Sequence, residues 1–475
     1  MTEPLNIGSH DLPITDELAA FMRTGWADTR RLDVAALPIA PWAAKRRAAL
    51  AARFPGERLV IPAGTLKVRS NDCDYRFRPH SAYAYLTGAG EPGDVLVVEP
   101  SGQSVLYVRP RSPREEGQEF YRDRRYGEFW AGRRPDLAEA AELYQIECRH
   151  IRDLQLTGPA RVLRGVDPTV DATVDTTANV RVDARGPVGE RDAELESFLS
   201  ELRLVKDEWE LGELRSAVDA TVRGFEDVVR ALPRALGHPR GERYLEGVFG
   251  LRARLEGNAV GYESIVASGA HACVLHWIRN DGALREGDLL LLDAGVESDT
   301  LYTADVTRTF PLSGRFSAVQ RQAYELVYEA QTAAIAALRP GARFRDFHLA
   351  AMRVICDGLR DWGLLKGSTD ELMETGLYRR YTLCSSGHML GLDVHDCAKS
   401  RAEAYLDGVL AEGHVLTVEP GLYFQPDDLT LPEELRGVGI RIEDDLVVTA
   451  DGATMMSAGL PRRPDEIESW MSGLS

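Results

Sequence analysis

The sequence predicts two domains, a smaller N-terminal α/β domain over residues 1–190 and a larger α+β domain over residues 191–475. Three observations lead to this fold class. The 475 residues are more than one hydrophobic core usually organises. Short apolar runs alternate with a helical pattern in the first part, whereas helical patterns precede turn-linked apolar runs in the second. A stretch rich in Asp, Thr, Arg and Gly, residues 167–189, separates the two patterns.

The elements of the first domain follow from short runs bounded by turn residues. Apolar residues at helical spacing predict a helix over Ala43–Phe54. Compact apolar runs predict buried strands over the following segments: Arg58–Pro62, Asp94–Glu99 and Ser104–Arg109. This alternation is typical of an α/β domain.

The second domain opens with a long helical pattern, Arg191–Ala231, in which leucine, phenylalanine and valine recur at helical spacing. Strand-like segments follow it: Asp288–Gly295, Val415–Glu419 and Gly439–Val448. Because turns join these strands, we expect a largely antiparallel sheet.

Composition and charge exclude several classes of protein. Hydrophobic residues make up 44% and charged residues 27% of the chain, which is typical of a soluble globular protein. The net charge of -18 argues against nucleic acid as a partner. No apolar run approaches the roughly 18 residues that cross a bilayer, and no signal peptide is visible at the N-terminus. The six cysteines have irregular spacing without CxxC, so we expect reduced thiols and a cytoplasmic location.

Four carboxylates lie at or near the ends of strongly apolar strand-like runs, at Asp293, Asp305, Glu419 and Glu443. Such positions predict burial, and a buried charge without a partner is very costly. Positive charge must therefore neutralise this group of side chains.

The source of that positive charge has two candidates. One is pairing with arginine, for which Arg308 and Arg441 are available. The other is a divalent cation. Asp293 and Asp305 are separated by eleven residues that include Gly295, a length that suits two strands folded back as a hairpin. Their carboxylates would then lie side by side and repel each other unless a cation lies between them.

His388 adds a nitrogen ligand to the predicted metal site. The flanking Gly387 and Gly391 permit close approach of the backbone. Four oxygen donors and one imidazole exceed the needs of a single tetrahedral ion and suit manganese, with iron, cobalt or zinc as competitors. Two ions bridged by carboxylates would use all five ligands.

A sulfur-containing zinc site is the alternative metal site. Two Cys/His pairs have ligand-like spacing: Cys273 with His276, and Cys384 with His388. This arrangement would leave the four carboxylates without a cation, so we consider it the weaker hypothesis.

The motifs that carry these residues resemble the metal-site motifs of aminopeptidase P, the Xaa-Pro aminopeptidase of the pita-bread metallopeptidase fold. They occur in the family order, as LLLLDAGVE, ADVTRTF, GHMLGLDVHD, VEPGLY and GIRIEDDLVV. The resemblance is strong over residues 198–471. The segment NDCDYRFRPHSAYAYLTG also resembles the smaller domain of that family, which argues against methionine aminopeptidases. The intact set of ligands argues against creatinase, which lacks them.

The resemblance implies roles for the metal ligands. Asp305 and Glu443 would bridge two divalent ions, most suitably manganese, with Asp293 completing the shell of one ion. His388 and Glu419 would complete the other. A hydroxide held between the ions would be the nucleophile.

The resemblance also implies roles for residues around the metals. Glu419 would act as general base and then as general acid toward the leaving nitrogen. His276 and His395 match histidines that contact substrate and stabilise the tetrahedral intermediate. Arg441 matches a partner of the metal-binding carboxylates, and Tyr262 matches a hydroxyl beside them.

One position departs from the family pattern. Cys384 stands where the family commonly has a histidine four residues before the metal ligand, and a neutral thiol is a much weaker hydrogen-bond donor. The resemblance as a whole implies an Xaa-Pro aminopeptidase acting on peptides with proline in second position, and Cys384 is the reason to keep an alternative. A prolidase-like or otherwise repurposed amidohydrolase is the alternative, and a non-catalytic binding protein is a third hypothesis. Relatives also imply a homodimer or homotetramer.

Overall fold

The structure is a computed structural model that describes residues 5–8, 11–27, 29, 31, 33–178 and 188–474. The chain forms two compact units, Met1–Leu199 and Ser200–Ser475. The end of the first unit falls within helix α8 (Val188–Glu201), which also contains the predicted domain boundary between residues 190 and 191. That boundary stays a prediction.

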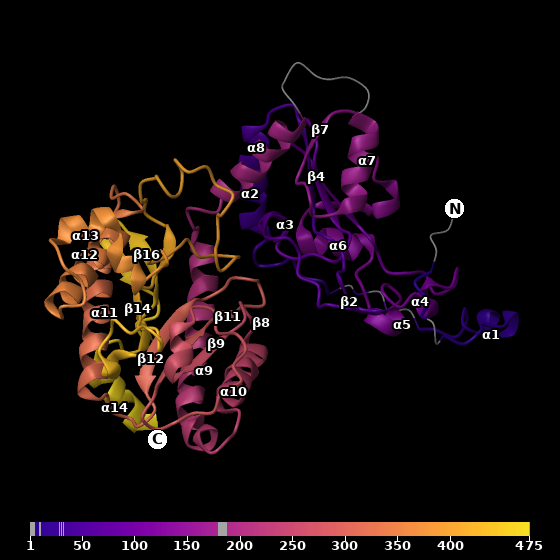
Figure 1. Cartoon of the computed structure of the whole chain (residues 1–475). Helices are drawn as coiled ribbons and strands as arrows, with labels where there is room; N and C mark the ends of the chain where they lie inside the picture. The colour runs from indigo at the N-terminus through magenta and orange to yellow at the C-terminus, as the bar shows by residue number, and fades with distance from the viewer. Residues whose placement is uncertain are drawn as a thin grey trace. The chain divides into compact units, whose positions relative to one another are not determined.

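The first unit is built on a mixed five-stranded sheet with the strand order β6-β5-β4-β1-β7. Figure 1 labels β4 and β7 of this sheet. The central neighbours β1, β4 and β5 are antiparallel, whereas β7 and β6 join the two edges in parallel. The strands of this unit are β1 (Arg58–Pro62), β2 (Val68–Ser70), β3 (Cys73–Asp74), β4 (Val95–Val98), β5 (Ser104–Val108), β6 (Glu147–His150) and β7 (Ala160–Val162). The three predicted strands correspond to β1, β4 and β5, so those predictions are confirmed.

Eight helices are described in the first unit, if α8 is counted with it: α1 (Asp16–Phe21), α2 (Ala40–Arg53), α3 (Ser81–Thr87), α4 (Glu119–Arg122), α5 (Glu128–Ala131), α6 (Leu137–Tyr144), α7 (Pro168–Ala178) and α8. The predicted helix over residues 43–54 is α2, which begins three residues earlier with a proline in its first turn. Residues 168–178 of the predicted linker form α7, because Asp167 accepts a hydrogen bond from Thr169 N at 2.8 Å and caps the helix. The remaining part, residues 179–187, lies outside the described residues.

The second unit contains the longer helices: α9 (Glu208–Leu236), α10 (Gly241–Glu256), α11 (Ala318–Ala337), α12 (Asp346–Asp361), α13 (Thr369–Thr375) and α14 (Pro464–Leu474). The single long helix predicted over Arg191–Ala231 is wrong, since the pattern divides into α8 and α9. The interruption has two causes. Asp207 caps α9 in a capping box with Glu210, and the buried Lys206 turns away to pair with Asp396 at 2.9 Å.

The strands of the second unit are short and antiparallel, as predicted. They are β8 (Ala259–Val260), β9 (Ile265–Ser268), β10 (Leu289–Ala294), β11 (Val296–Glu297), β12 (Val306–Pro311), β13 (Val415–Val418), β14 (Gly421–Tyr423), β15 (Gly439–Arg441), β16 (Asp444–Thr449) and β17 (Gly452–Met455). The strand predicted over Gly439–Val448 is instead two strands. β15 pairs with β14 and β16 pairs with β13, so the chain changes sheets at Glu443.

Helix pairs enclose these strands. In Figure 1, α9 and α10 lie beside β8, β9 and β11, whereas α11 and α12 lie on the opposite side of β12 and β14. All six residues of β10 are buried, and a large apolar core extends from the helices through the strands. Polar side chains inside this core are therefore costly unless they are paired. The α+β class predicted for this part of the chain is confirmed.

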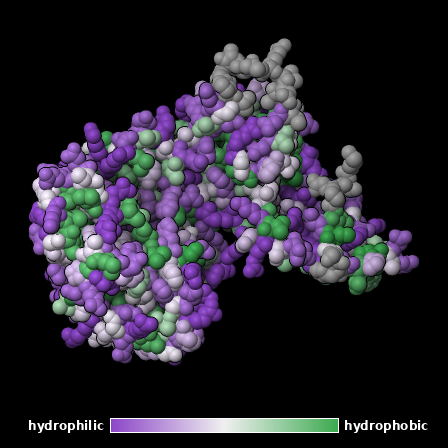
Figure 2. All heavy atoms as spheres, viewed as in Figure 1, coloured by the Kyte–Doolittle hydropathy of each residue, from purple (hydrophilic) through white to green (hydrophobic). Residues whose placement is uncertain are grey.

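The visible surface of the molecule is mainly hydrophilic, with hydrophobic side chains between polar ones (Figure 2). Among the described residues, no helix has the length and apolar character needed to cross a membrane.

Candidate active site

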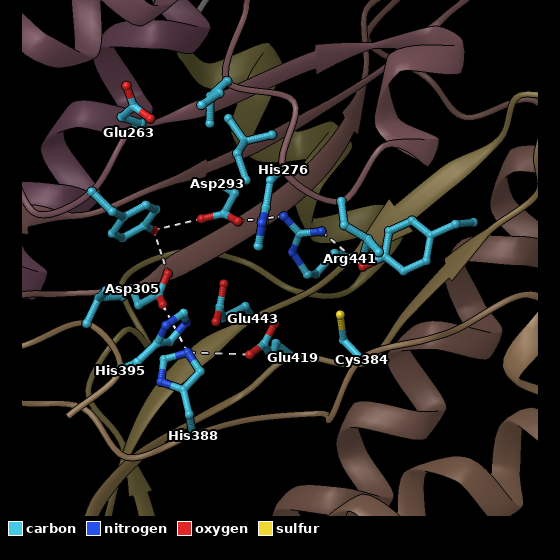
Figure 3. A pocket seen from close by; sticks show the side chains of 16 residues that line it. Glu263, His276, Asp293, Asp305, Cys384, His388, His395, Glu419, Arg441 and Glu443 are labelled. Atoms are coloured by element: carbon cyan, nitrogen blue, oxygen red, sulfur yellow. Dashed lines mark hydrogen bonds and ion pairs between the residues drawn. The ribbon is translucent and has the colours of Figure 1, made fainter. Parts of the chain in front are cut away.

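The predicted site residues meet in one cleft of the second unit, with a volume of about 270 Å³ (Figure 3). The cleft is lined by Tyr262, Glu263, Ile265, Leu275, His276, Ile278, Asp293, Asp305, Cys384, His388, Val394, His395, Glu419, Tyr423, Arg441 and Glu443. Every metal-ligand and catalytic candidate from the sequence is in this set.

The predicted hairpin brings two aspartates together. β10 and β12 pair in antiparallel register with Asp293 opposite Thr307, so Asp305, immediately before β12, lies near Asp293. The Tyr262 hydroxyl lies 2.7 Å from Asp293 Oδ1 and 2.5 Å from Asp305 Oδ1. One hydroxyl carries one proton and can donate to only one carboxylate at a time. The second close contact therefore requires a further positive charge or proton.

Arg441 supplies one positive charge to the site. Its Nη2 donates to Asp293 Oδ2 at 2.5 Å, its Nη1 to the Tyr423 hydroxyl at 2.9 Å and its Nε to Thr307 Oγ1 at 3.2 Å. The arginine alternative is thus correct for Asp293 alone. The other available arginine, Arg308, pairs with Asp444 at 2.6 Å instead of with any of the four carboxylates.

The remaining three carboxylates surround His388 and Thr307. His388 Nε2 lies 3.3 Å from Asp305 Oδ2 and 3.5 Å from Glu419 Oε1. The Thr307 hydroxyl donates to Glu443 Oε2 at 2.6 Å. Figure 3 shows the side chains of Asp305, His388, Glu419 and Glu443 pointing toward one another.

The donor set fits divalent cations. Asp305, His388 and Glu443 each offer a ligand atom, and those atoms lie within 4.8 Å of one another. Asp293 and Glu419 extend the group on either side. Four carboxylates face one guanidinium and one imidazole, so negative charge remains uncompensated in a buried place. Oxygen donors with a single nitrogen suit manganese, iron, cobalt or zinc.

The pKa values of these groups reflect the same shortage of positive charge. Burial raises the pKa of Glu419 to about 7. Burial and the repulsion from Asp305 raise the pKa of Glu443 well above its usual value. Burial opposes a charged His388, but its hydrogen bond to Asp305 and the charge of Glu419 raise its pKa to about 9. The cluster thus retains protons that a cation would replace.

Two histidines and a cysteine complete the cleft. The His395 ring packs edge-on against the His388 ring at 4.4 Å, and burial lowers the pKa of His395. His276 enters from the loop between β9 and β10 (Figure 3). Cys384 lines the cleft near Tyr423 and Glu419.

The alternative Cys/His zinc site finds no support in the geometry. The buried Cys273 thiol donates to the carbonyl of Phe424 at 3.2 Å, and burial raises the pKa of this thiol to about 12. A thiol that is kept neutral is a poor zinc ligand. In the described part of the chain, the candidate metal group contains neither Cys273 nor Cys384.

Comparison with known proteins decides the family. Residues 212–450 match the family model of metallopeptidase family M24, and residues 43–162 match that of the aminopeptidase P N-terminal domain. Xaa-Pro aminopeptidase 1 of Streptomyces coelicolor is 58% identical over 469 residues, which is 97% of this chain and 93% of that protein. The chain belongs to the aminopeptidase P group of metallopeptidase family M24.

Solved structures of this family agree with the fold. Pseudomonas aeruginosa aminopeptidase PepP superposes with a TM-score of 0.80 at 33% identity, covering 92% of this chain and 99% of that protein. Escherichia coli aminopeptidase P with the inhibitor Pro-Leu superposes with a TM-score of 0.78 at 32% identity, covering 92% and 98%. The second unit is thus the pita-bread domain, as the resemblance implied. As a member of this aminopeptidase P group, the protein is a metallo-aminopeptidase that depends on divalent metal ions.

Three polar residues of this aminopeptidase P site were missed in the sequence. Thr307 bonds Glu443, Tyr423 bonds Arg441, and Asp445 accepts from the backbone N of Asp305 at 3.0 Å. Side chains two residues apart on a strand share a face. Thr307 and Asp445 lie two positions after the predicted Asp305 and Glu443, so this alternation could have found them. Tyr423 lies on β14, whereas Glu419 follows β13, so alternation gives no signal for Tyr423.

Proposed function

We propose that the protein hydrolyses the peptide bond between an N-terminal residue and a proline in second position. The observation that supports this most directly is the convergence of all five predicted metal donors in one buried cleft of an aminopeptidase P family chain. The named relatives that cover nearly the whole chain are Xaa-Pro aminopeptidases. Proline offers no N–H and a fixed φ angle, so such a bond needs a dedicated enzyme.

The five donors would hold two divalent ions. Asp305, His388 and Glu443 offer ligand atoms within 4.8 Å of one another, and Asp293 and Glu419 lie beside them, so these five residues would hold the ions. When bound, the ions would polarise the scissile carbonyl and lower the pKa of water. We favour manganese, because four of the five ligands are hard oxygen donors.

The residues around the donors would orient the substrate and move its proton. Glu419 faces the cleft, where its carboxylate would take up a proton from water and return it. That proton would go to the leaving nitrogen of proline. His276 and His395 line the cleft beside the ligands, where they would donate to a substrate carbonyl that develops negative charge. Arg441 and Tyr262 would hold Asp293 in position through their bonds to it.

A digest of defined peptides tests this proposal. The full-length protein, incubated with manganese, is expected to release arginine from Arg-Pro-Pro and to leave Arg-Ala-Pro uncut, as measured by mass spectrometry. Asp305→Ala should abolish cleavage, whereas Asp299→Ala should not, since Asp299 is exposed and lines no part of the cleft. If the metal-loaded protein leaves Arg-Pro-Pro intact, the proposal is wrong. Reconstitution of metal-free protein with manganese, cobalt, zinc or iron tests the choice of metal.

The prolidase-like alternative is less well supported, because the relatives carry the name Xaa-Pro aminopeptidase. Its remaining support is Cys384, which lines the cleft at the departure from the family pattern. A prolidase requires the free carboxylate of a C-terminal proline, whereas an aminopeptidase accepts a longer chain. Faster cleavage of Arg-Pro than of Arg-Pro-Pro-Gly would favour the alternative. A non-catalytic role is disfavoured, because none of the five donors is lost.

We also propose that the protein forms a homodimer or homotetramer through its N-terminal unit. Phe21 of α1 and Phe129 of α5 are 75% and 63% exposed, an unusual exposure for such large apolar side chains. Figure 2 has hydrophobic side chains in the region of α1 and α5. Light scattering after gel filtration should give a mass of two or four chains, which Phe129→Ser would reduce. A monomeric wild type would contradict this proposal.

We also propose that the protein is located in the cytoplasm. It is supported by six cysteines that are all free, since oxidising compartments favour disulfides. Fractionation of cells that express the full chain would test it.

A further inference from the structure

A buried carboxylate outside the metal site ties together the loop that carries His276. Glu242, at the start of α10, is 0% exposed and pairs with no arginine or lysine in the described part of the chain. Its Oε1 accepts from the backbone N of Ser268 at 2.9 Å and from His271 Nδ1 at 2.7 Å. Its Oε2 accepts from Trp277 Nε1 at 2.9 Å and from the backbone N of Gly282 at 2.7 Å.

These four donors bracket His276 in the sequence. Ser268 and His271 precede it, whereas Trp277 and Gly282 follow it. The His271 and Trp277 rings also stack on each other with centroids 3.8 Å apart and an interplanar angle of 20°. A single side chain thus connects both arms of the loop that presents His276 to the cleft.

His276 depends on this loop for its position. Its side chain makes no hydrogen bond or ion pair with any described residue, and it is exposed in the cleft. The nearest anchor is the adjacent Trp277, whose indole is bonded to Glu242. The close fit at Gly282, where any Cβ would collide with the Glu242 carboxylate and the His271 ring, indicates a tightly packed anchor.

We propose that Glu242 is a positioning residue of the reaction, which fixes His276 against the substrate by binding both arms of its loop. This inference rests on the proposed role of His276. It assigns Glu242 no contact with substrate or metal, since Glu242 does not line the cleft.

Glutamine is an informative replacement because it keeps the shape and removes one acceptor. Each carboxylate oxygen accepts from one backbone N–H, from Ser268 on one side and from Gly282 on the other. The glutamine amide has a single oxygen, so in either orientation its NH₂ faces one of these N–H groups. A buried donor without an acceptor is costly, and one arm of the loop should move away.

A double-mutant cycle on the metal-loaded full-length enzyme tests the inference. Glu242→Gln should lower kcat for Arg-Pro-Pro by roughly 10- to 100-fold, the loss expected when a reacting group is misplaced by about 1 Å. KM should change less than kcat, and the manganese content should be unchanged. In a His276→Ala background, Glu242→Gln should lower kcat by less than about twofold, because the group that it positions is already gone.

Matched controls separate this role from general destabilisation. Glu246→Gln, one turn further along α10, should leave kcat unchanged, since Glu246 makes no hydrogen bond or ion pair with the described residues. Trp277→Phe keeps the ring and removes one donor to Glu242, so it should give a smaller loss of kcat with the same dependence on His276. If Glu242→Gln fails to fold, the same double-mutant cycle can be measured with Trp277→Phe.

The outcomes distinguish the inference from the function on which it rests. If His276→Ala retains full kcat, the proposed role of His276 is wrong. If His276→Ala loses rate and Glu242→Gln lowers kcat by the same factor in both backgrounds, the positioning role is wrong. Loss of manganese in Glu242→Gln would also overturn it.

Discussion

Metal binding should release protons from the site, and their number can be worked from the structure. His388, with a pKa raised to about 9, and Glu419, with a pKa raised to about 7, both need to be deprotonated to act as ligands. At pH 7 the first is almost fully protonated and the second is half protonated. Together they contribute about 1.5 protons per chain.

The release has a defined pH dependence. Both pKa values lie above those of the free side chains, so these groups hold their protons as the pH falls and lose them as the pH rises. At pH 8 the same two groups contribute only about one proton. Burial and the repulsion from Asp305 also raise the pKa of Glu443, so protonated Glu443 adds to the release.

Calorimetry provides the measurement. Manganese is titrated into metal-free protein at constant pH in buffers of different ionisation enthalpy, and the slope of the observed heat gives the number of protons released. Glu419→Gln should reduce the release at pH 7 by about half a proton. Glu412→Gln is the matched control, because Glu412 is exposed and lies seven residues earlier on the same segment.

The reasoning fails if the release at pH 7 is below about half a proton per chain. It also fails if the release does not decrease between pH 7 and pH 8. Either result would mean that the carboxylates and His388 already have the charge states of ligands before metal binds, compensated by groups other than those described.

Three further predictions concern single residues. Asp305→Ala should abolish both manganese content by elemental analysis and peptidase activity, because Asp305 lies at the centre of the donor group; retained turnover would contradict the two-metal proposal. His395→Ala should keep its metal and lose roughly 10²- to 10³-fold in kcat, the loss typical of one donor to a developing oxyanion. Metal loss in that variant would give His395 a different role. Cys384→His should change the ratio of kcat/KM for Arg-Pro and Arg-Pro-Pro-Gly, whereas Cys384→Ser should not; equal ratios in all three proteins would make Cys384 neutral for substrate choice.

The strands and the central hairpin could be predicted because their determinants are local. The apolar run before Asp293 is too short for a helix and forms the fully buried β10. The distance from Asp293 to Asp305 along the chain fits a return strand, and both carboxylates contact the Tyr262 hydroxyl. The apolar run that ends in Asp293 thus predicted both a buried strand and a residue of the site.

The two interruptions were missed because a partner distant in sequence contributes to each of them, although the capping box of Asp207 and Glu210 is a local signal for the start of α9. Helical periodicity runs through residues 202–207, yet Lys206 pairs with Asp396, 190 residues away, and the helix ends before it. The pattern over Gly439–Val448 is continuous, yet Glu443 faces Thr307 and the chain changes sheets there. Local propensity predicts an uninterrupted strand over Gly439–Val448, and the polar partner of Glu443 elsewhere in the chain overrides it.

The residues of the site are held in place in two ways, by strands and by anchored loops. Most metal donors lie on strands or directly beside them, where ladder hydrogen bonds fix the backbone. The two histidines proposed to face substrate lie on loops, which need anchors of another kind. Asp396, next to His395, is bonded to Lys206 Nζ at 2.9 Å and lies 3.0 Å from an Arg203 nitrogen. Glu242 anchors the loop of His276 in a similar way, by accepting hydrogen bonds from two backbone N–H groups, the Trp277 indole and His271. A buried carboxylate behind each loop therefore gives both histidines a fixed backbone, while their side chains line the cleft.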